Sequence, residues 1–353
     1  MDRFRYFCLL TFVCTIFYIP LNAQESLQKT DDQYFRIVFY NVENLFDVFD
    51  DPFKNDDEFL PKGPRKWDNR RFYKKLNNIY RVLISIGEWD PPGIVGMCEI
   101  ENRFVINQLL SKTPLSRFDY QLIHFESPDF RGIDVALLYR PIHFRPDTSF
   151  IIPLYFPFDP GATTRDILYA KGRLLNEDTL HVFVNHWPSR YGGYLETKPK
   201  REYAAGLLRQ KVDSLLKCQP LCHIVIMGDF NDNPLDQSIS KTLAAEDKLP
   251  ADHVNGLINL MLPFTQGNPK GTLKFRENWD IFDQFIVTGS LLRDSCKTFI
   301  DPPAAFIFDA EFLMENDQRW GGIRPFRTYN GFSYQGGYSD HLPVYINLRV
   351  SGK

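Results

Sequence analysis

An α/β domain in which mixed β-sheets are covered by helices is the fold class that this 353-residue sequence predicts. Short apolar runs alternate with stretches in which apolar residues recur at helical spacing. Turn signals also join some neighbouring strand-like runs into hairpins, and this combination implies mixed rather than purely parallel sheets. No repeat, low-complexity tract or long linker divides the chain. We therefore expect one domain over residues 30–353.

The first part of the predicted domain alternates strands with helices. The run "YFRIVFY" (34–40) is a continuous apolar stretch of the kind found in buried strands. Apolar residues at helical spacing predict an amphipathic helix over 68–86, and Gly87 provides a stop signal. The run "GIVGMC" (93–98) predicts a second buried strand, and the stretch 102–110 is again amphipathic.

The rest of the chain is richer in strands. One further helix is expected at about 200–217, where apolar side chains fall on one side. The residues "NED" between two strand-like runs are a hairpin signal. Apolar and alternating runs predict strands at 120–125, 133–139, 166–175, 179–185, 223–227, 281–287 and 342–350.

Residues 1–23 have the layout of a secretory signal peptide. "MDRFR" carries two arginines, an uncharged apolar run of 16 residues follows, and "NAQES" offers a small residue before a polar start. We expect cleavage after Ala23 and a secreted or periplasmic product without stable membrane insertion, because the run is short for a hydrocarbon core of about 30 Å. An uncleaved anchor and a lipid-modified Cys14 are the alternatives.

The charge balance gives no sign of a broad polyanion-binding surface. The formal net charge is −3, and the 44% of hydrophobic residues are enough for a large core. A near-neutral balance argues against tight, salt-sensitive DNA binding by the whole domain. It still allows a nuclease that makes few phosphate contacts.

The cysteine pattern indicates neither a disulfide scaffold nor a zinc site. Signal cleavage would leave Cys98, Cys218, Cys222 and Cys296. Cys98 lies in an apolar run and is expected to be a buried thiol, whereas Cys218 and Cys222 could pair or stay free. No histidine cluster at zinc spacing accompanies them, so zinc is not expected.

Polar clusters stand at the ends of the predicted strands. In chain order they read "YNVENLFD", "CEIEN", "NHWPSR", "GDFNDNP", "WDIFDQF" and "SDH". Polar groups on loops at one end of a sheet are typical of a functional site on an α/β scaffold. The acids, amides and histidines that could meet there are Asn41, Glu99, His186, Asp229, Asn231, Asp283, Asp340 and His341.

These side chains fit the hydrolysis of a phosphate ester. An oxygen-rich set suits Mg²⁺, or alternatively Mn²⁺ or Ca²⁺, better than zinc. A carboxylate can take a proton from the attacking water, and an imidazole can stabilise the transition state or protonate the leaving oxygen. Taken singly, Asn41 could be an Asx-turn residue and Asp283 a charge at a sheet edge, and Glu101 could replace Glu99 as a ligand.

"GDFND" together with "SDHLPV" resembles the endonuclease/exonuclease/phosphatase superfamily, which includes deoxyribonuclease I and neutral sphingomyelinases. The match follows the order of that family from Asn41 to His341. The resemblance implies a four-layer sandwich of two packed mixed β-sheets flanked by helices, the deoxyribonuclease I-like fold. It also implies a divalent-metal-dependent hydrolase acting on phosphate ester bonds.

The resemblance further implies a role for each residue of the set. It assigns the metal site to Glu99, Asn41 and Asp340, and it prefers Glu99 over Glu101. It assigns handling of the attacking water, the phosphate and the leaving oxygen to His186, Asp229, Asn231, Asp283 and His341. Within that set, Asp283 is the expected carboxylate partner of His341.

Three arginines are candidate substrate-binding residues. Arg131 directly precedes a predicted strand, Arg190 lies in a basic, aromatic loop, and Arg327 lies in the glycine- and aromatic-rich segment before "SDH". Each could also be a solvated or packed surface residue. The resulting prediction is an exported, monomeric phosphodiesterase that cuts nucleic acid as an endonuclease. A phosphatase, a sphingomyelinase-like enzyme and a catalytically inactive binding protein are the alternatives.

Overall fold

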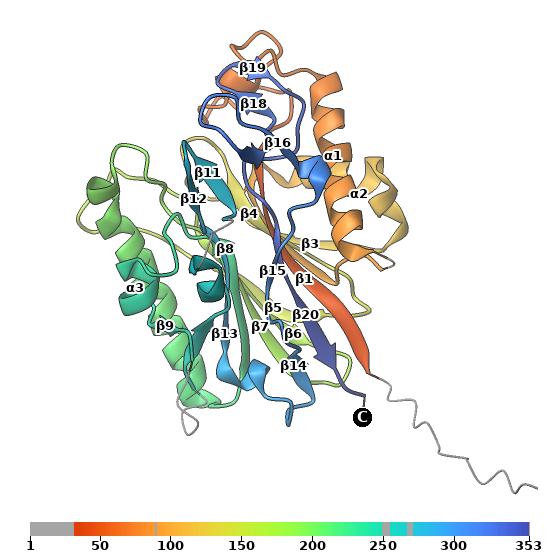
Figure 1. The fold of residues 1–353 in the computed structure, drawn as a ribbon, viewed down its shortest axis with the longest axis vertical. Coiled ribbons are helices and arrows are strands. Elements are labelled where there is room, and N and C mark those ends of the chain that lie inside the picture. Colours follow the sequence, from red (N-terminus) through yellow and green to blue (C-terminus); the bar gives the residue numbers. More distant parts are fainter. Residues whose placement is uncertain (1–31, 89, 249–254, 267–270, 353) are drawn as a thin grey trace, which may run out of the picture.

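Four layers make up the protein, as the computed structural model shows for residues 32–88, 90–248, 255–266 and 271–352. Two large mixed β-sheets pack face to face (Figure 1). Helices α1 (Asn69–Gly87) and α2 (Arg103–Lys112) cover one outer face, and α3 (Tyr194–Cys218) covers the other. This arrangement confirms the predicted sandwich. The expected signal peptide, 1–23, lies outside the described residues, and within them no helix could cross a membrane.

The first sheet is built around β1 (Gln33–Leu45). This strand runs parallel to β2 (Ile94–Ile100) and antiparallel to β20 (Val344–Val350). The strand order is β14-β20-β1-β2-β4-β3, with β15 also paired to β20. The other strands of this sheet are β3 (Gln121–His124), β4 (Asp134–Tyr139), β14 (Thr298–Ile300) and β15 (Phe306–Ile307).

The second sheet has the parallel pair β7 (Thr179–His186) and β8 (His223–Asp229) near its middle, and β13 (Asp283–Thr288) runs antiparallel to β8. The strand order is β5-β6-β7-β8-β13-β10-β9. Its other strands are β5 (Arg145–Ile152), β6 (Ile167–Arg173), β9 (Ala245–Glu246) and β10 (Leu257–Asn259).

Small hairpins gather at one end of the sandwich (Figure 1). They pair β11 (Leu273–Phe275) with β12 (Asn278–Asp280), β16 (Met314–Asn316) with β17 (Ile323–Pro325), and β18 (Tyr329–Asn330) with β19 (Ser333–Tyr334). Short helical turns complete the structure: η1 (Asp57–Phe59), η2 (Pro114–Arg117), η3 (Ser238–Thr242), η4 (Leu262–Thr265), η5 (Gly289–Leu292) and η6 (Glu311–Leu313).

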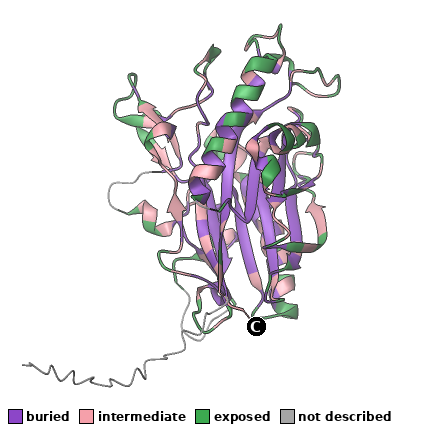
Figure 2. Ribbon diagram, turned by 90° about the vertical axis from the view of Figure 1, so that its right-hand side faces the viewer, coloured by how far each residue is buried: buried purple, intermediate pink, exposed green. Residues whose placement is uncertain are grey.

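Apolar side chains fill the spaces between the layers. Phe39 and Phe285 are fully buried between the two sheets, Leu76 of α1 packs beneath the first sheet, and Leu208 of α3 packs beneath the second. The strands are buried over most of their length, whereas the outer faces of the helices are exposed (Figure 2). The burial of both faces explains why these strands have nearly continuous apolar sequences.

The predicted elements differ from the observed ones mainly at exposed or irregular places. The sequence predicts the third helix at about 200–217, but the helix begins at Tyr194 and includes Pro199, which lacks the N–H that a helix interior uses. Arg201 supplies other bonds in this turn, including one of 2.8 Å to Thr197 Oγ1. Strand β5 was not predicted, because this edge strand is polar and contains Pro146.

The structure also shows the state of the cysteines. Cys98 is buried, and the described cysteines, including Cys218 and Cys222, are all free thiols. Burial raises the pKa of the Cys222 thiol to about 11, so it stays protonated at neutral pH. The possible Cys218–Cys222 disulfide is therefore not formed in this structure.

Candidate active site

Strand ends from both sheets meet at one edge of the sandwich. Asn41 of β1 stands opposite Cys98 of β2 in the first sheet. In the second sheet, Asp229 at the end of β8 stands opposite His186 of β7 on one side and Asp283 of β13 on the other. The pairing register therefore brings residues near the ends of β1, β2, β7 and β8 close to the first residue of β13.

Asn41 joins the two sheets at this place. It is fully buried, and its Nδ2 lies 3.0 Å from Asp229 Oδ2 and 3.3 Å from Glu99 Oε1. The second oxygen of Glu99 accepts a bond of 2.8 Å from the backbone N–H of Asn44. Glu99 has φ +61° at an irregularity of β2, and this left-handed conformation re-aims its side chain relative to the strand.

Glu101 does not share this position. Its Oε2 accepts a bond from the backbone N–H of Asp47, away from Asn41. Burial raises the pKa of Glu101 to about 8. The structure therefore brings Glu99, and not Glu101, together with Asp229.

His341 and Asp283 form a buried pair beside Asp229. His341 Nδ1 lies 2.7 Å from Asp283 Oδ2, and His341 Nε2 lies 3.8 Å from Asp229 Oδ2. Burial alone would lower the pKa of His341, but the carboxylates of Asp283 and Asp229 raise it well above its usual value. His341 is therefore a cation at neutral pH. The backbone N–H of His341 donates to Ser339 Oγ at 3.0 Å, and this bond holds the turn at residues 339–341.

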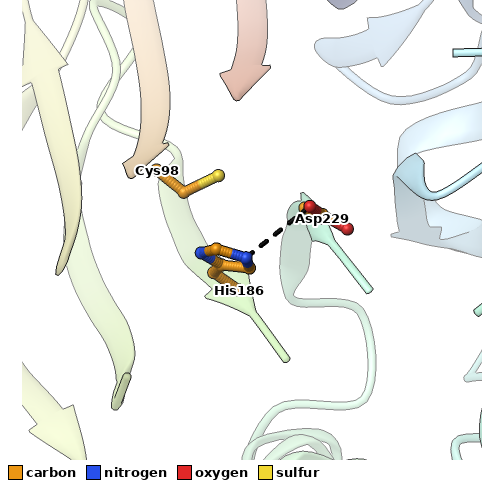
Figure 3. A group of neighbouring side chains, drawn as sticks. All are labelled: Cys98, His186 and Asp229. Carbon is orange, nitrogen blue, oxygen red and sulfur yellow. Dashed lines mark ion pairs between the residues drawn. The ribbon is translucent and has the colours of Figure 1, made fainter. Parts of the chain in front are cut away.

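His186 of the neighbouring strand β7 lies beside the same carboxylate (Figure 3). Its Nε2 lies 3.6 Å from Asp229 Oδ2, and its buried Nδ1 has no hydrogen-bond partner among the described residues. Burial, together with the guanidinium groups of Arg165 and Arg131, holds the pKa of His186 well below its usual value. His186 is thus neutral, in contrast to His341.

Asp229 lies at the centre of these contacts. Burial and the neighbouring Asp283 raise the pKa of Asp229 to about 6, although the charge of His341 opposes this rise. The thiol of Cys98 lies beside Asp229 and His186 (Figure 3). Burial and then the charge of Asp229 raise the pKa of Cys98 well above its usual value, so this thiol is neither a nucleophile nor a ready metal ligand.

Asn231 completes the loop after β8. Its backbone N–H donates to Asp229 Oδ1 at 2.9 Å, and its Nδ2 donates to the carbonyl of Trp187 at 3.0 Å. Arg190 donates to the carbonyl of Asn231 at 2.8 Å and to Asp232 and Asp236. Most donors of Arg190 are therefore used to hold this loop, and its predicted contact with substrate stays untested.

Asp340 lies in a second, adjoining group of charges. Its Oδ2 is 2.7 Å from Arg327 Nη2, and Arg327 is also 3.3 Å from Glu43. Glu43 is buried and accepts a bond of 2.7 Å from the backbone N–H of Thr328. Burial and the charge of Asp340 raise the pKa of Glu43. The sequence reasoning missed Glu43, although it belongs to the same polar cluster as Asn41.

The buried Lys75 supports this group from helix α1. Its Nζ donates to the carbonyl of Tyr338 at 2.6 Å and to Thr328 Oγ1. Burial lowers the pKa of Lys75 to about 8, against the opposing effect of Glu43. The sequence analysis did not predict a role for Lys75 either. A lysine on the apolar face of the predicted helix was the signal that could have indicated it.

The donor set fits a hard divalent cation. Glu99 and Asp229 contribute carboxylate oxygens next to each other, and Asp340 lies near by on the adjoining charge group. The buried Asp283 Oδ1 has no hydrogen-bond partner among the described residues. Oxygen ligands of this kind favour Mg²⁺, Mn²⁺ or Ca²⁺ over softer metals. A bound divalent cation would supply Lewis-acid stabilisation of a phosphoryl group.

An oxygen-rich cluster with a cationic and a neutral histidine is suited to phosphate-ester hydrolysis. The sequence matches a family model described as Endonuclease/Exonuclease/phosphatase family over residues 36–350. The chain therefore belongs to the endonuclease/exonuclease/phosphatase family, whose members are metal-dependent phosphoesterases. The family resemblance expected from the sequence is confirmed.

Solved structures show the same fold at low sequence identity. A family protein from Bacteroides thetaiotaomicron has a TM-score of 0.55 and 13% identity, covering 91% of this chain and 99% of that chain. TDP2 of D. rerio, complexed with single-strand DNA product, has a TM-score of 0.54 and 16% identity (89% and 98% covered). A mannosyl-6-phosphatase of Bacteroides thetaiotaomicron has a TM-score of 0.55 and 14% identity (89% and 99% covered). No curated protein sequence matches the chain.

Proposed function

We propose that the protein is a divalent-metal-dependent phosphodiesterase that cuts nucleic acid, with unpaired strands as its preferred substrate. The observation that carries this proposal is a pair of large hollows, rich in cationic and aromatic side chains, that flank the catalytic cluster. A long polyanion can occupy both hollows, whereas a small phosphate monoester needs only one.

The first hollow, which we call the Trp320 hollow, has a volume of about 790 Å³. Phe275 and Trp320 on its walls are 62% and 41% exposed, so their rings are available to a base. The guanidinium of Arg276 lies 5.2 Å from the ring of Phe275 and 5.7 Å from that of Trp320. The hollow reaches the active site, because Arg327 and Asp340 also line it.

The second hollow, which we call the Tyr191 hollow, has a volume of about 620 Å³. Its lining includes the cations Arg131, Arg165 and Lys200 and the exposed ring of Tyr191. It also includes Asn44, whose backbone N–H binds Glu99. Cations and exposed rings are the side chains that bind a phosphate backbone and stack on unpaired bases.

A smaller hollow of about 120 Å³ connects the two. It shares Asn44, Phe59 and Arg65 with the Tyr191 hollow and Arg327 with the Trp320 hollow. We infer that a strand could bridge the two large hollows by way of Asn44, whose N–H binds Glu99. This continuity supports a nucleic acid over a small ester.

The residues of the cluster have distinct chemical tasks in this proposal. Glu99 and Asp229 would hold a divalent cation, which would supply neutralisation of charge on the phosphoryl oxygens. Asp229 can accept the proton of an attacking water at a carboxylate oxygen, with Asn231 and Asn41 fixing that carboxylate. His341, held as a cation by Asp283, stabilises the negative charge that develops on the phosphate. Neutral His186 can donate a hydrogen bond to a phosphate oxygen.

The decisive experiment compares substrates with the purified protein. We expect a single-stranded oligonucleotide, plasmid DNA or RNA to be cut in the presence of Mg²⁺, Mn²⁺ or Ca²⁺, and chelation to abolish cutting. Sphingomyelin, mannose 6-phosphate and bis-p-nitrophenyl phosphate are tested in parallel. Activity confined to mannose 6-phosphate or sphingomyelin would reject the nuclease. Cleavage of none of them with any metal would favour a binding protein.

A phosphatase acting on a small ester is the second candidate. The likeness to the mannosyl-6-phosphatase supports it, since that fold match covers nearly all of both chains. The parallel assay with mannose 6-phosphate distinguishes the two candidates directly.

Export and the monomeric state are further parts of the proposal. The apolar run, and the small residue Ala23 before the polar start, support cleavage of residues 1–23. We expect the chain recovered from a periplasmic or culture fraction to begin at Gln24, and to elute from a sizing column as one chain. An intact N-terminus would contradict cleavage.

A further inference from the structure

A second group of carboxylates lies outside the catalytic cluster, in the segment between β1 and α1. Asp50, Asp56 and Asp57 each offer a carboxylate oxygen within 4.8 Å of the others. None of the three contacts the catalytic residues in the described structure, and the proposed function does not use them. They come from a short stretch that reads "DDPFKNDDE".

Asp56 is the residue that points to a missing ligand. It is only 2% exposed, yet its Oδ1 has no hydrogen-bond partner among the described residues. Its other oxygen accepts a bond of 3.1 Å from the backbone N–H of Asp51. A buried carboxylate oxygen without a partner carries a large desolvation cost, which a bound cation would remove.

The charges around Asp56 are of the same sign. Within the described residues, no lysine or arginine forms an ion pair with Asp50, Asp56 or Asp57. The cation of the segment, Lys54, points elsewhere and donates to the carbonyls of Ser127 and Asp129 at 3.0 Å. Burial, followed by the charges of Asp50 and Asp51, raises the pKa of Asp56.

We propose that this acidic loop is a calcium site, separate from the catalytic metal. Calcium takes six to eight oxygen ligands in irregular geometry, so a loop with several carboxylates suits calcium better than magnesium, which requires a strict octahedron. One buried and two exposed carboxylates leave the remaining positions to backbone oxygens and water. The site is independent of the substrate that the enzyme cuts.

Occupation of the site would act on the wall of the Tyr191 hollow. Asn55 and Glu58, which flank Asp56 and Asp57, line that hollow. The N–H of Asn55 donates to the carbonyl of Phe130 at 2.8 Å, which ties the loop to the segment carrying Arg131. Calcium would therefore hold this wall in place by cancelling the repulsion within the loop.

Calcium titration calorimetry on the full chain tests the site. The metal-free protein carries Glu99→Gln and Asp229→Asn, so that two carboxylates of the catalytic cluster are lost. We expect this background to bind a single Ca²⁺ and to gain thermal stability from it. Adding Asp56→Asn should weaken Ca²⁺ binding by about ten-fold or more, since affinity follows the number of ligand charges. The stabilisation by Ca²⁺ should be lost with it.

Two further variants make the outcome decisive. Asp50 is exposed, so Asp50→Asn should weaken binding without lowering the thermal midpoint of the metal-free protein. Asp213→Asn, on the surface of α3, removes the same charge elsewhere and should leave binding unchanged. The proposal is overturned if the background binds no Ca²⁺, or if binding survives both Asp50→Asn and Asp56→Asn. Failure of nucleic acid cleavage would leave this result unaffected.

Discussion

His341 Nδ1 lies 2.7 Å from Asp283 Oδ2, and this contact joins the two β-sheets at the active site. Asp283 begins β13 of the second sheet, and His341 lies three residues before the start of β20 in the first. Thr272 supports both sides of the contact. Its Oγ1 accepts from the N–H of Asp283 at 3.2 Å, and its carbonyl accepts from the N–H of Leu342 at 2.7 Å. The base of the β11–β12 hairpin therefore positions the pair.

This pair predicts a pH-dependent contribution to stability. The pKa of His341 is raised in the folded state above the value of about 6.5 in the unfolded chain. Its stabilisation is therefore complete below about pH 6.5 and is lost as the pH rises through the folded pKa. We expect Asp283→Asn to lower the free energy of unfolding by about 1.5–3 kcal/mol at pH 6.

Urea unfolding of both proteins with chelator present, from pH 6 to pH 10, measures this effect. The difference between wild type and Asp283→Asn should narrow at alkaline pH, when His341 loses its proton in both proteins. Asp213→Asn serves as the control and should show no such trend. A difference that stays constant over the whole range contradicts the charged pair.

The Glu99 and Asp229 carboxylates should matter for turnover and not for folding. We expect Glu99→Gln and Asp229→Asn to lower kcat by about 10²–10⁴-fold, because the amides cannot take a proton or bind a cation as strongly. Each amide keeps an oxygen that can accept the bond from Asn44 or Asn231. The thermal midpoint, followed by calorimetry, should therefore change little, and a large drop would mark these residues as structural.

The exposed rings of the Trp320 hollow should act on long substrates only. We expect Phe275→Ala and Trp320→Ala each to raise KM for a single-stranded oligonucleotide by roughly ten-fold, since stacking on a base contributes about 1–3 kcal/mol. Hydrolysis of bis-p-nitrophenyl phosphate should be unchanged. Phe104→Ala on α2, 41% exposed on an outer layer, is the matched control. Equal losses on both substrates would indicate that the rings only support the fold.

Lys75 should stabilise the segment that carries Arg327 and Asp340. Lys75→Met leaves Glu43 buried without this cation, and we expect a loss of about 3–5 kcal/mol in the free energy of unfolding. Adding Glu43→Gln should restore part of the loss, because the buried charge that Lys75 and Arg327 together offset is then gone. Chemical unfolding of the single and double variants measures this coupling. Losses that simply add would show that the two charges act independently.

The main residues of the site could be predicted from the sequence because the ends of buried strands have a recognisable pattern. A buried strand shows as an apolar run, and Asp229 or His341 stands out as the polar residue at its end. Asn41 and Glu99 follow the same rule on neighbouring strands. Parallel and antiparallel pairing then brings these ends together, and the family order of the motifs indicates which ends meet.

Side-chain partners are less accessible to sequence reasoning. Arg190 has the composition of a phosphate-binding residue, but it donates to the carbonyl of Asn231 and to two aspartates of that loop. Lys75 lies on the buried face of α1, and the apolar pattern of that helix gives no reason for a lysine there. Its hydrogen-bond partners lie more than 250 residues away in the chain. Such contacts are fixed by tertiary packing, which a local pattern does not encode.

The division of the active centre between two sheets also determines when the site is complete. Asn41 and His341 come from opposite ends of the region matched by the family, and neither sheet alone holds the full set of reacting groups. A polypeptide still growing on the ribosome therefore lacks the complete set, and the proposed nuclease would be inactive at that stage. The set is complete only after β20 pairs with β1.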